Sequence, residues 1–226
     1  MKSKNHNVLR VYRSKAQAKE SYDKISHFYD YFAGVFEKKY RNMALERSNI
    51  KRGEIVLEIG FGTGHCLKQM AQSVGENGKA YGIDISSGML EVSKQRLEEA
   101  GLLNRVELQC EDALKMPYKD NEFDAVFMSF ALELFDTPEI PKVLAEIKRV
   151  LKPNGRLGVV SMSKEDEDSI LLRLYEWTHK RFPQYIDCRP IYVKQSIKDA
   201  GFGIAHGEKV KLFGLPGEIV ICVKSS

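Results

Sequence analysis

A glycine-rich turn between two apolar runs most strongly constrains what this chain can fold into. Residues 56–65 read VLEIGFGTGH, in which an apolar run leads into three alternating glycines: Gly60, Gly62 and Gly64. A second apolar run, residues 80–83, ends in Asp84. Many α/β proteins bind a nucleoside with one arrangement: a strand, a glycine turn, a helix and a second strand that ends in a carboxylate. The glycines let a ligand approach the backbone closely, and the carboxylate accepts both ribose hydroxyls.

Apolar runs alternate with amphipathic segments along most of the chain. Five runs read as buried strands, at Ile55–Ile59, Ala80–Ile83, Val106–Gln109, Ala125–Ser129 and Leu157–Ser161. Helical patterns lie between them, at His65–Val74, Ser87–Ala100 and Ile140–Leu151. Two last strand-like runs, Phe202–Phe213 and Glu218–Val223, are joined through GLPG, which is a hairpin signal. This order predicts an α/β fold with a seven-stranded, mostly parallel sheet, helices on both faces and one antiparallel strand.

Two segments fall outside this alternation. The first 50 residues read as helix rich in aromatic residues, and residues 165–189 carry a further helical pattern after the fifth strand. We therefore expect residues 1–50 to form a helical extension or lid. Residues 51–226 then form the ligand-binding domain, with a helical insertion at about 164–190 that also lies over the mouth of the sheet.

Composition limits the classes of protein that remain. No run of eighteen apolar residues and no apolar N-terminal signal core occurs, which predicts a cytoplasmic protein. Four scattered cysteines predict buried reduced thiols, and no metal-ligand cluster is visible. Residues 1–52 carry a net charge of +8 and the remainder −4. The basic segment 1–52 is a solvated helical face, a peripheral contact with an anionic membrane surface, or a contact with an acidic substrate.

The glycine turn does not fit a dinucleotide. That pattern requires a glycine three residues after Gly62, where this chain has His65. Glu58, directly before the turn, would repel a diphosphate and attract an ammonium group. The turn therefore predicts a ligand without phosphate.

Polar residues follow the next three predicted strands. A strand-end acid such as Asp84 often caps a helix, but Ser86 can cap the helix here and leave Asp84 for a ribose. Asp112 can accept from an adenine amine while the Ala113 N–H meets a ring nitrogen, although Asp112 also suits an Asx-turn. Ser129 begins the segment SFAL. We expect this segment to line both the nucleoside ligand and the molecule that reacts with it, although Phe130 within it fits the core equally well.

These residues resemble the class I S-adenosylmethionine-dependent methyltransferases. The matching pieces are VLEIGFGTG at 56–64, GIDIS at 82–86, EDALKMPY at 111–118, FDAVFMSFALE at 123–133 and LKPNGRL at 151–157. The resemblance implies a strand order of 3-2-1-4-5-7-6 with strand 7 antiparallel, and S-adenosylmethionine as cofactor. It also implies cofactor-binding residues: Glu58 and the glycines at the methionine end, Asp84 with Ile85 at the ribose, and Asp112 with Ala113 at the adenine.

Two further segments resemble a subgroup of that family, the ubiquinone/menaquinone C-methyltransferases and bacterial phosphatidylethanolamine N-methyltransferases. They are SYDKISHFYDYF at 21–32 and CRPIYVKQSIKDAGF at 188–202. The resemblance implies that Tyr22 covers the methionine end of the cofactor and that the second segment borders the acceptor pocket. The implied acceptor is small or lipid-like, with a quinol-type carbon or an amine nitrogen as the methylated atom.

Candidate catalytic side chains are few. His27, His65 and His179 are the histidines nearest the expected pocket, and each fits a structural or surface position as well. Arg189 could hold an acceptor oxyanion or phosphate, or form a surface ion pair with Asp187 or Glu165.

Three alternatives remain open at this point. A nicotinamide-dependent oxidoreductase is disfavoured by Glu58 and by the incomplete dinucleotide pattern. Nucleic acid is an improbable substrate because SFALE replaces the motifs typical of base-targeting enzymes, although the basic N-terminus keeps an RNA methyltransferase open. A cofactor-binding protein without catalysis is the third alternative. We expect a monomer or a homodimer.

Overall fold

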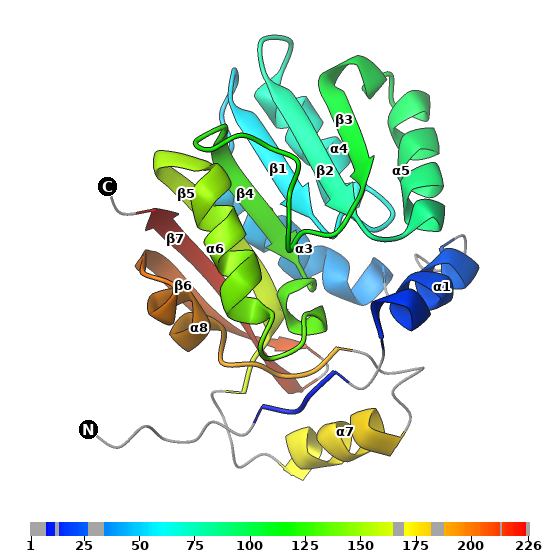
Figure 1. Ribbon diagram of the computed structural model, residues 1–226, viewed down its shortest axis with the longest axis vertical. Coiled ribbons are helices and arrows are strands. Elements are labelled where there is room, and N and C mark those ends of the chain that lie inside the picture. Colours follow the sequence, from blue (N-terminus) through cyan, green and yellow to red (C-terminus); the bar gives the residue numbers. More distant parts are fainter. Residues whose placement is uncertain are drawn as a thin grey trace.

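A seven-stranded sheet forms the centre of the molecule in a computed structural model (Figure 1). The structure describes residues 8–11, 14–26, 34–164, 170–181, 188–212 and 214–224. The strand order is β3-β2-β1-β4-β5-β7-β6. Strands β1 to β5 pair in parallel, whereas β7 is antiparallel to both of its neighbours, which confirms the predicted topology. The strands are β1 Ile55–Ile59, β2 Lys79–Asp84, β3 Val106–Cys110, β4 Phe123–Ser129, β5 Leu151–Met162, β6 Phe202–Leu212 and β7 Leu215–Lys224.

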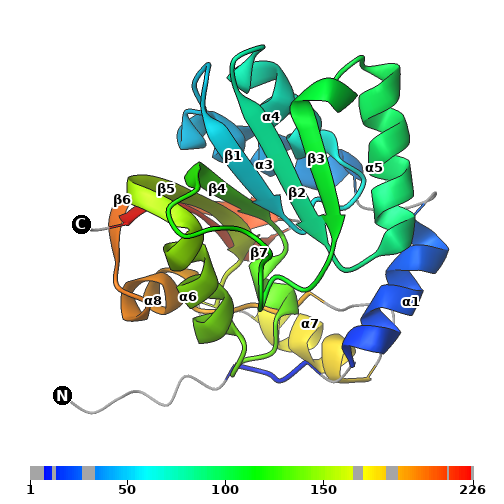
Figure 2. The ribbon, with the colours of Figure 1, turned by 45° about the horizontal axis from the view of Figure 1, so that its top comes forward.

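Helices cover both faces of this sheet because alternate strand residues point to opposite sides. On one face, Val56 and its same-side neighbours pack in a cluster with α3 (Gly34–Ser48), α4 (His65–Val74) and α5 (Ser87–Glu99). On the other, Leu57 and its neighbours pack with α6 (Ile140–Val150) and α8 (Val193–Asp199). The result is a three-layer α/β core (Figure 2).

Two boundaries differ from the expectation. Strand β5 begins at Leu151 and not at the predicted Leu157, so Pro153-Asn154-Gly155 belongs to the strand. Leu151 pairs with Phe123, and the register shifts before the pairing resumes between Ala125 and Arg156. Likewise, Pro216 and Gly217 lie in β7 and pair with β6, so the hairpin turn is shorter than expected.

The remaining helices lie at the end of the sheet where the parallel strands finish (Figure 1). They are α1 (Lys15–Ile25) and α7 (Ile170–Arg181), and two short 3-10 turns occur at Leu103–Arg105 and Leu132–Leu134. Helix α1 packs on α5, as both ribbon views show. Among the described residues, no helix is long and apolar enough to cross a membrane.

Candidate active site at the strand ends

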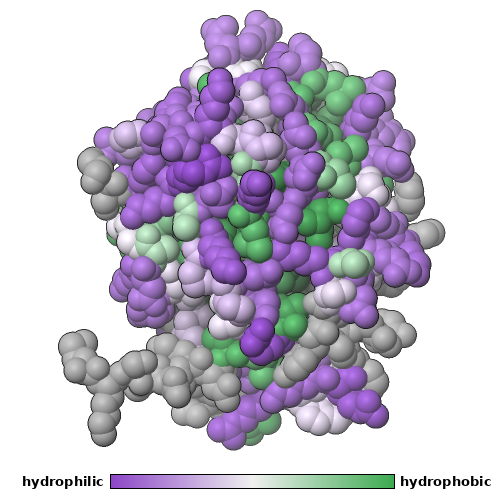
Figure 3. Space-filling view, viewed as in Figure 1, coloured by the Kyte–Doolittle hydropathy of each residue, from purple (hydrophilic) through white to green (hydrophobic). Residues whose placement is uncertain are grey.

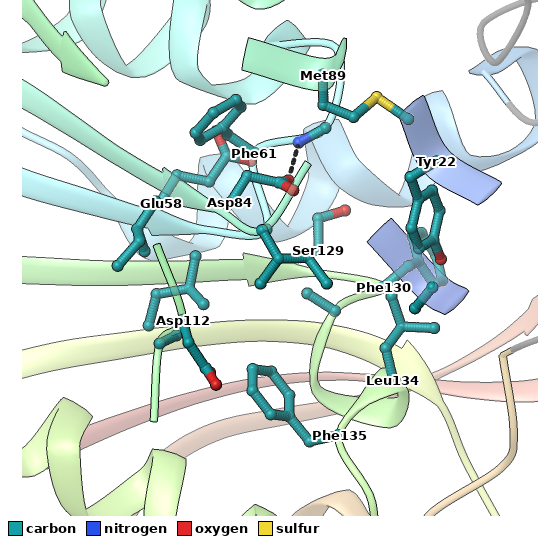
Figure 4. A pocket seen from close by; sticks show the side chains of 18 of the residues that line it. Tyr22, Glu58, Phe61, Asp84, Met89, Asp112, Ser129, Phe130, Leu134 and Phe135 are labelled. Atoms are coloured by element: carbon teal, nitrogen blue, oxygen red, sulfur yellow. Dashed lines mark hydrogen bonds between the residues drawn. The ribbon is translucent and has the colours of Figure 1, made fainter. Parts of the chain in front are cut away.

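A cavity of ≈ 340 Å³ lies at the carboxyl ends of β1, β2 and β4. The strands and their following turns form its floor, and residues of α1 and α3 also line it. Figure 4 shows Tyr22 entering from α1 beside Phe130 and Leu134, with Asp84 and Glu58 across the space. Nine of the ten residues predicted to bind the cofactor line this cavity: Tyr22, Glu58, Gly60, Gly62, Asp84, Ile85, Asp112, Ala113 and Ser129.

The tenth, Gly64, has a structural position instead. It is the N-cap residue of α4 with a φ of 80°, and it does not belong to the cavity wall. A Cβ at this position would lie 2.2 Å from Ser93 Oγ on α5. Gly64 is therefore needed for a left-handed turn and for helix packing, and its ligand contact stays a prediction.

The other two glycines leave room at the cavity floor. Gly62 has a φ of 50°, and a Cβ there would meet nothing within 4 Å, because the position faces open space. Gly60 has a φ of 70°, and a Cβ there would come within 2.7 Å of Ala131 Cβ after β4. The turn is thus tight against one wall and open toward the cavity.

Asp84 is held in place by the backbone around it. One carboxylate oxygen accepts from the Gly62 N–H at 2.9 Å, and the other accepts from the Ser86 N–H at 2.9 Å. Burial nevertheless raises the pKa of Asp84 above its ordinary value. Ser86 caps α5 by accepting from the Met89 N–H, as expected, so Asp84 is free of that task.

Glu58 and Arg41 place opposite charges at one end of the cavity. Glu58 is 2% exposed, and its Oε2 has no hydrogen-bond partner. Burial raises the pKa of Glu58 well above its ordinary value, and the nearby positive charge of Arg41 partly offsets this effect. Arg41 lines the same cavity and pairs with Glu37 at 3.4 Å. Sequence reasoning missed Arg41, because nothing in the local pattern of α3 distinguishes it from the other basic residues there.

Asp112 carries an ion pair that the sequence did not predict. Its Oδ2 lies 2.6 Å from Lys15 Nζ, which also approaches Glu139 at 3.1 Å. Its Oδ1 accepts from the Leu114 N–H at 3.0 Å, so the Asx-turn interpretation is correct as well. Asp112 therefore joins the N-terminal helix to the turn after β3 while it lines the cavity.

Apolar side chains form most of the remaining wall, namely Phe61, Met89, Phe130, Leu134 and Phe135 (Figure 4). Phe130 is 7% exposed and has a φ of 51°, a conformation that non-glycine residues rarely adopt. It lines the cavity and packs in the core, so its core placement is confirmed, while its contact with a ligand stays a prediction. Ser129 Oγ, one residue earlier, is buried without a hydrogen-bond partner.

The candidate catalytic residues do not gather at the cavity. His27 lies outside the described residues. His179 is 1% exposed on α7 and is absent from the cavity wall, whereas His65 lines it. Arg189 is fully buried behind the wall, where its guanidinium donates to the Phe135 carbonyl oxygen. The surface ion pair proposed for Arg189 is therefore wrong, and burial lowers its pKa to about 10 despite nearby Asp136 and Glu133.

Helix α1 is fixed over the cavity by Asp23. This carboxylate accepts from Ser86 Oγ at 2.6 Å and from the Gly88 N–H at 2.8 Å, at the N-terminus of α5. Burial alone would raise the pKa of Asp23, but these hydrogen bonds and Lys19 lower it to about 2. A Cβ at Gly88 would lie 2.9 Å from Asp23 Cα, so glycine is what allows this close approach.

The cavity suits an adenosyl amino acid. Its unpartnered Glu58 Oε2 can accept from an ammonium group, and Arg41 beside it can bind a carboxylate. Three acids at the ends of β1, β2 and β3, Glu58, Asp84 and Asp112, disfavour a phosphate. No group of three side chains able to hold a metal ion occurs in the part of the chain that the structure describes.

Comparison with known proteins agrees with this geometry. Residues 56–155 match the family described as methyltransferase domain. A demethylmenaquinone methyltransferase of Symbiobacterium thermophilum is 36% identical over 151 residues, which cover 65% of this chain and 59% of that protein. The solved structure of a SAM-dependent methyltransferase from Aquifex aeolicus has a TM-score of 0.64 and 25% identity, and covers 91% of this chain and 97% of its own.

The fold is also shared with a protein of different activity. The [4+2]-cyclase SpnF has a TM-score of 0.78 with 20% identity over 96% of this chain and 98% of its own, a likeness that shows the fold alone. The chain spans less than two thirds of the length of the curated relatives it matches. The family match confirms the resemblance read from the glycine turn and the later motifs.

Proposed function

Because residues 56–155 match a methyltransferase domain, we propose that this protein is a class I S-adenosylmethionine-dependent methyltransferase. It transfers a methyl group to a small lipophilic acceptor, with a quinol-type ring carbon as the favoured site. The observation that carries the proposal is the set of strand-end acids around a cavity, whose charge disfavours a phosphate. Glu58 and Asp84 line it together with the open position at Gly62. Such a site suits a cationic ligand rich in hydroxyls.

We assign each end of the donor to particular side chains. Glu58 binds its ammonium group and Arg41 its carboxylate. Asp84 accepts from the ribose hydroxyls through the lone pairs of its oxygens that the backbone N–H groups do not use. Asp112 and the Ala113 N–H bind the adenine edge, and Lys15 keeps the Asp112 carboxylate oriented at 2.6 Å. Tyr22, Ile85 and Ser129 complete the contacts; the Ser129 hydroxyl is buried without another partner.

The protein's contribution to the reaction is alignment and exclusion of water. S-adenosylmethionine, when bound, supplies a methyl group activated by a sulfonium. Tyr22, Phe130 and Phe135 wall the cavity with ring surfaces, which favour a cation and leave little space for water. A quinol carries acidic hydroxyls of its own, so its ionisation supplies the carbon nucleophile, and holding the two reactants in line lowers the entropic barrier.

We further propose that residues 1–50 act as a lid on the domain formed by 51–226, whose insertion at about 164–190 faces the acceptor. Helix α1 supports this role because it contributes Lys15, Ala18 and Tyr22 to the cavity wall. Asp23 and Lys15 tie the helix to α5 and to the turn after β3. Closure through these contacts would shut the donor from solvent.

The test is an acceptor screen with methyl-labelled S-adenosylmethionine. A chemically reduced quinol with a free ring position and a short isoprenoid tail is compared with phosphatidylethanolamine and with bulk RNA. We expect label in the quinol, on a ring carbon by mass spectrometry, and a loss of turnover in Asp84→Ala but not in Glu98→Ala, an exposed position on α5. Label only in the amino-lipid or RNA would overturn the acceptor, and no transfer to any would overturn the activity.

A further inference from the structure

Helix α7 carries the exposed large hydrophobic residues of the described chain. They are Ile170, Leu171, Leu174 and Trp177, with exposed fractions of 83%, 43%, 56% and 58%. The spacing i, i+1, i+4, i+7 gathers them on one side of a helix that turns about 100° per residue. Scattered exposed apolar residues need no explanation, but a set confined to one helical face indicates a contact surface.

The opposite side of α7 is already in use. Leu172 is 1% exposed and His179 is 1% exposed, and Tyr175 donates to the Cys188 carbonyl oxygen at 3.1 Å. These contacts attach α7 to the body of the protein. The helix therefore has two apolar faces, of which only one is covered by the rest of the described chain.

Basic side chains border the outward face within α7. Arg173, Lys180 and Arg181 are exposed along it, while four acids at residues 165–168, outside the described residues, precede the helix. The one acid of the helix, Glu176, is paired with Lys164 at 2.7 Å. At the lower edge of Figure 3, where Figure 1 draws α7, hydrophobic and hydrophilic residues lie next to one another.

This composition fits the interface of an anionic lipid bilayer. Basic residues are attracted to the anionic headgroups, and a tryptophan prefers the headgroup level. With 12 residues α7 is too short to span a bilayer, so it would lie along the surface. A second protein is a less suitable partner for this surface. A stable protein interface uses roughly 20–30 residues a side, whereas the exposed apolar face of α7 offers four.

We propose that α7 docks this protein on an anionic membrane surface through Ile170, Leu171, Leu174 and Trp177, with its cations on the headgroups. Both ribbon views place α7 beside the extended segment 8–11, whose Val11 lines the cavity. Docking there would bring the cavity wall near the bilayer, from which a lipophilic molecule can enter. The docking itself does not depend on methyl transfer.

Trp177 allows a direct test, because it is the chain's single tryptophan. The full-length protein is titrated with vesicles of phosphatidylglycerol and, separately, of phosphatidylcholine. With phosphatidylglycerol we expect the emission to shift to shorter wavelength, quenching by brominated lipid, and flotation with the vesicles. Ile170→Ser/Leu174→Ser keeps the probe and should weaken partitioning at least about tenfold, since two apolar side chains no longer enter the interface.

Charge is tested with matched pairs. Arg173→Gln/Lys180→Gln should weaken binding to phosphatidylglycerol. The control Lys142→Gln/Lys198→Gln, which changes two exposed lysines on α6 and α8, should weaken this binding less. Circular dichroism checks that each variant is folded. Unchanged emission with phosphatidylglycerol, or equal binding by the serine variant, would overturn the proposal. The proposal would also be overturned if the wild-type protein binds no vesicles and light scattering shows that it is a dimer, whereas the serine variant is a monomer. Vesicle binding requires no turnover, so these outcomes are separate from those of the methyl-transfer assay.

Discussion

Single residues at this site bind the backbone while they face the cavity. Asp84 illustrates this, since both its oxygens accept from backbone N–H groups of the glycine turn and of the segment that begins α5. These bonds hold the carboxylate in one orientation at the cavity wall before any ligand arrives. Preorganisation of this kind reduces the ordering cost of binding.

Replacing Asp84 by alanine should weaken donor binding. The ribose hydroxyls would lose their acceptor and the Gly62 N–H its partner, which predicts a loss of ~1–3 kcal/mol in affinity for S-adenosylhomocysteine by calorimetry. Glu98→Ala, exposed on the outer part of α5, is the matched control. Equal affinity in Asp84→Ala and the control would show that this acid does not hold the sugar.

Arg41 offers a test that discriminates between the two ends of the ligand. Arg41→Met keeps a long side chain but removes the charge, so S-adenosylhomocysteine should bind about tenfold or more weakly. 5′-Methylthioadenosine lacks the amino-acid end, and its affinity should stay the same. A loss of affinity for both ligands would place Arg41 in a structural role instead.

At the scale of elements, a carboxylate from one helix caps another. Asp23 of α1 accepts from the Gly88 N–H and from the N-cap Ser86 of α5, where a negative charge is favourable. Gly88 permits the approach, and Lys15 adds a second attachment at Asp112. Helix α1 is thereby joined to two of the turns that follow the strands.

Asp23→Asn should loosen α1 specifically. Amide hydrogens of residues 15–25 should exchange faster by mass spectrometry, and S-adenosylhomocysteine should dissociate faster, because the cap charge is lost. Glu20→Gln on the same helix, whose partner Lys24 is 2.7 Å away at the surface, should change neither rate. Because the pKa of Asp23 is lowered to about 2, its contribution is full above the unfolded value of about 3.9 and is lost toward pH 2. Protection of α1 that is identical in both variants would contradict this attachment.

For the whole molecule, the sequence was sufficient for the architecture and for one half of the site. Period-2 and period-3.6 patterns are local, so the order of strands and helices, with Glu58, Asp84 and Asp112 at strand ends, could be predicted. Arg41 and Lys15 could not, because they reach the cavity only through long-range packing of α3 and α1. The same packing brings Asp23 to the start of α5. The burial of Arg189 was missed for the same reason, and the packing role of Gly64 because a glycine required for packing has the same sequence signal as one that faces a ligand.

A buried acid makes the stability of the whole fold depend on pH. Glu133 is fully buried and accepts from Ser161 Oγ and the Met162 N–H, yet burial raises its pKa to about 7. Between about pH 4.5 and pH 7, the folded state thus holds a proton on Glu133 that the unfolded state has released. Stability should therefore fall as pH rises from about 4.5 to about 7.

Glu133→Gln should remove this dependence. We compare the melting temperatures of the variant and of wild type by differential scanning calorimetry. Relative to wild type, the melting temperature of the variant should be roughly 5 °C higher at pH 8 than it is at pH 5. Glu139→Gln, a less buried acid of the same region, is the control and should follow wild type. Parallel pH curves for wild type and Glu133→Gln would show that Glu133 is ionised throughout.

The central claim is that the strand-end cavity binds an adenosyl amino acid without phosphate. The most direct measurement is a pair of calorimetric titrations of the full-length protein, one with S-adenosylhomocysteine and one with NADH. We predict one-to-one binding of S-adenosylhomocysteine and no heat of binding from NADH. Binding of NADH with none of S-adenosylhomocysteine would contradict the assignment of the cavity and of the reaction.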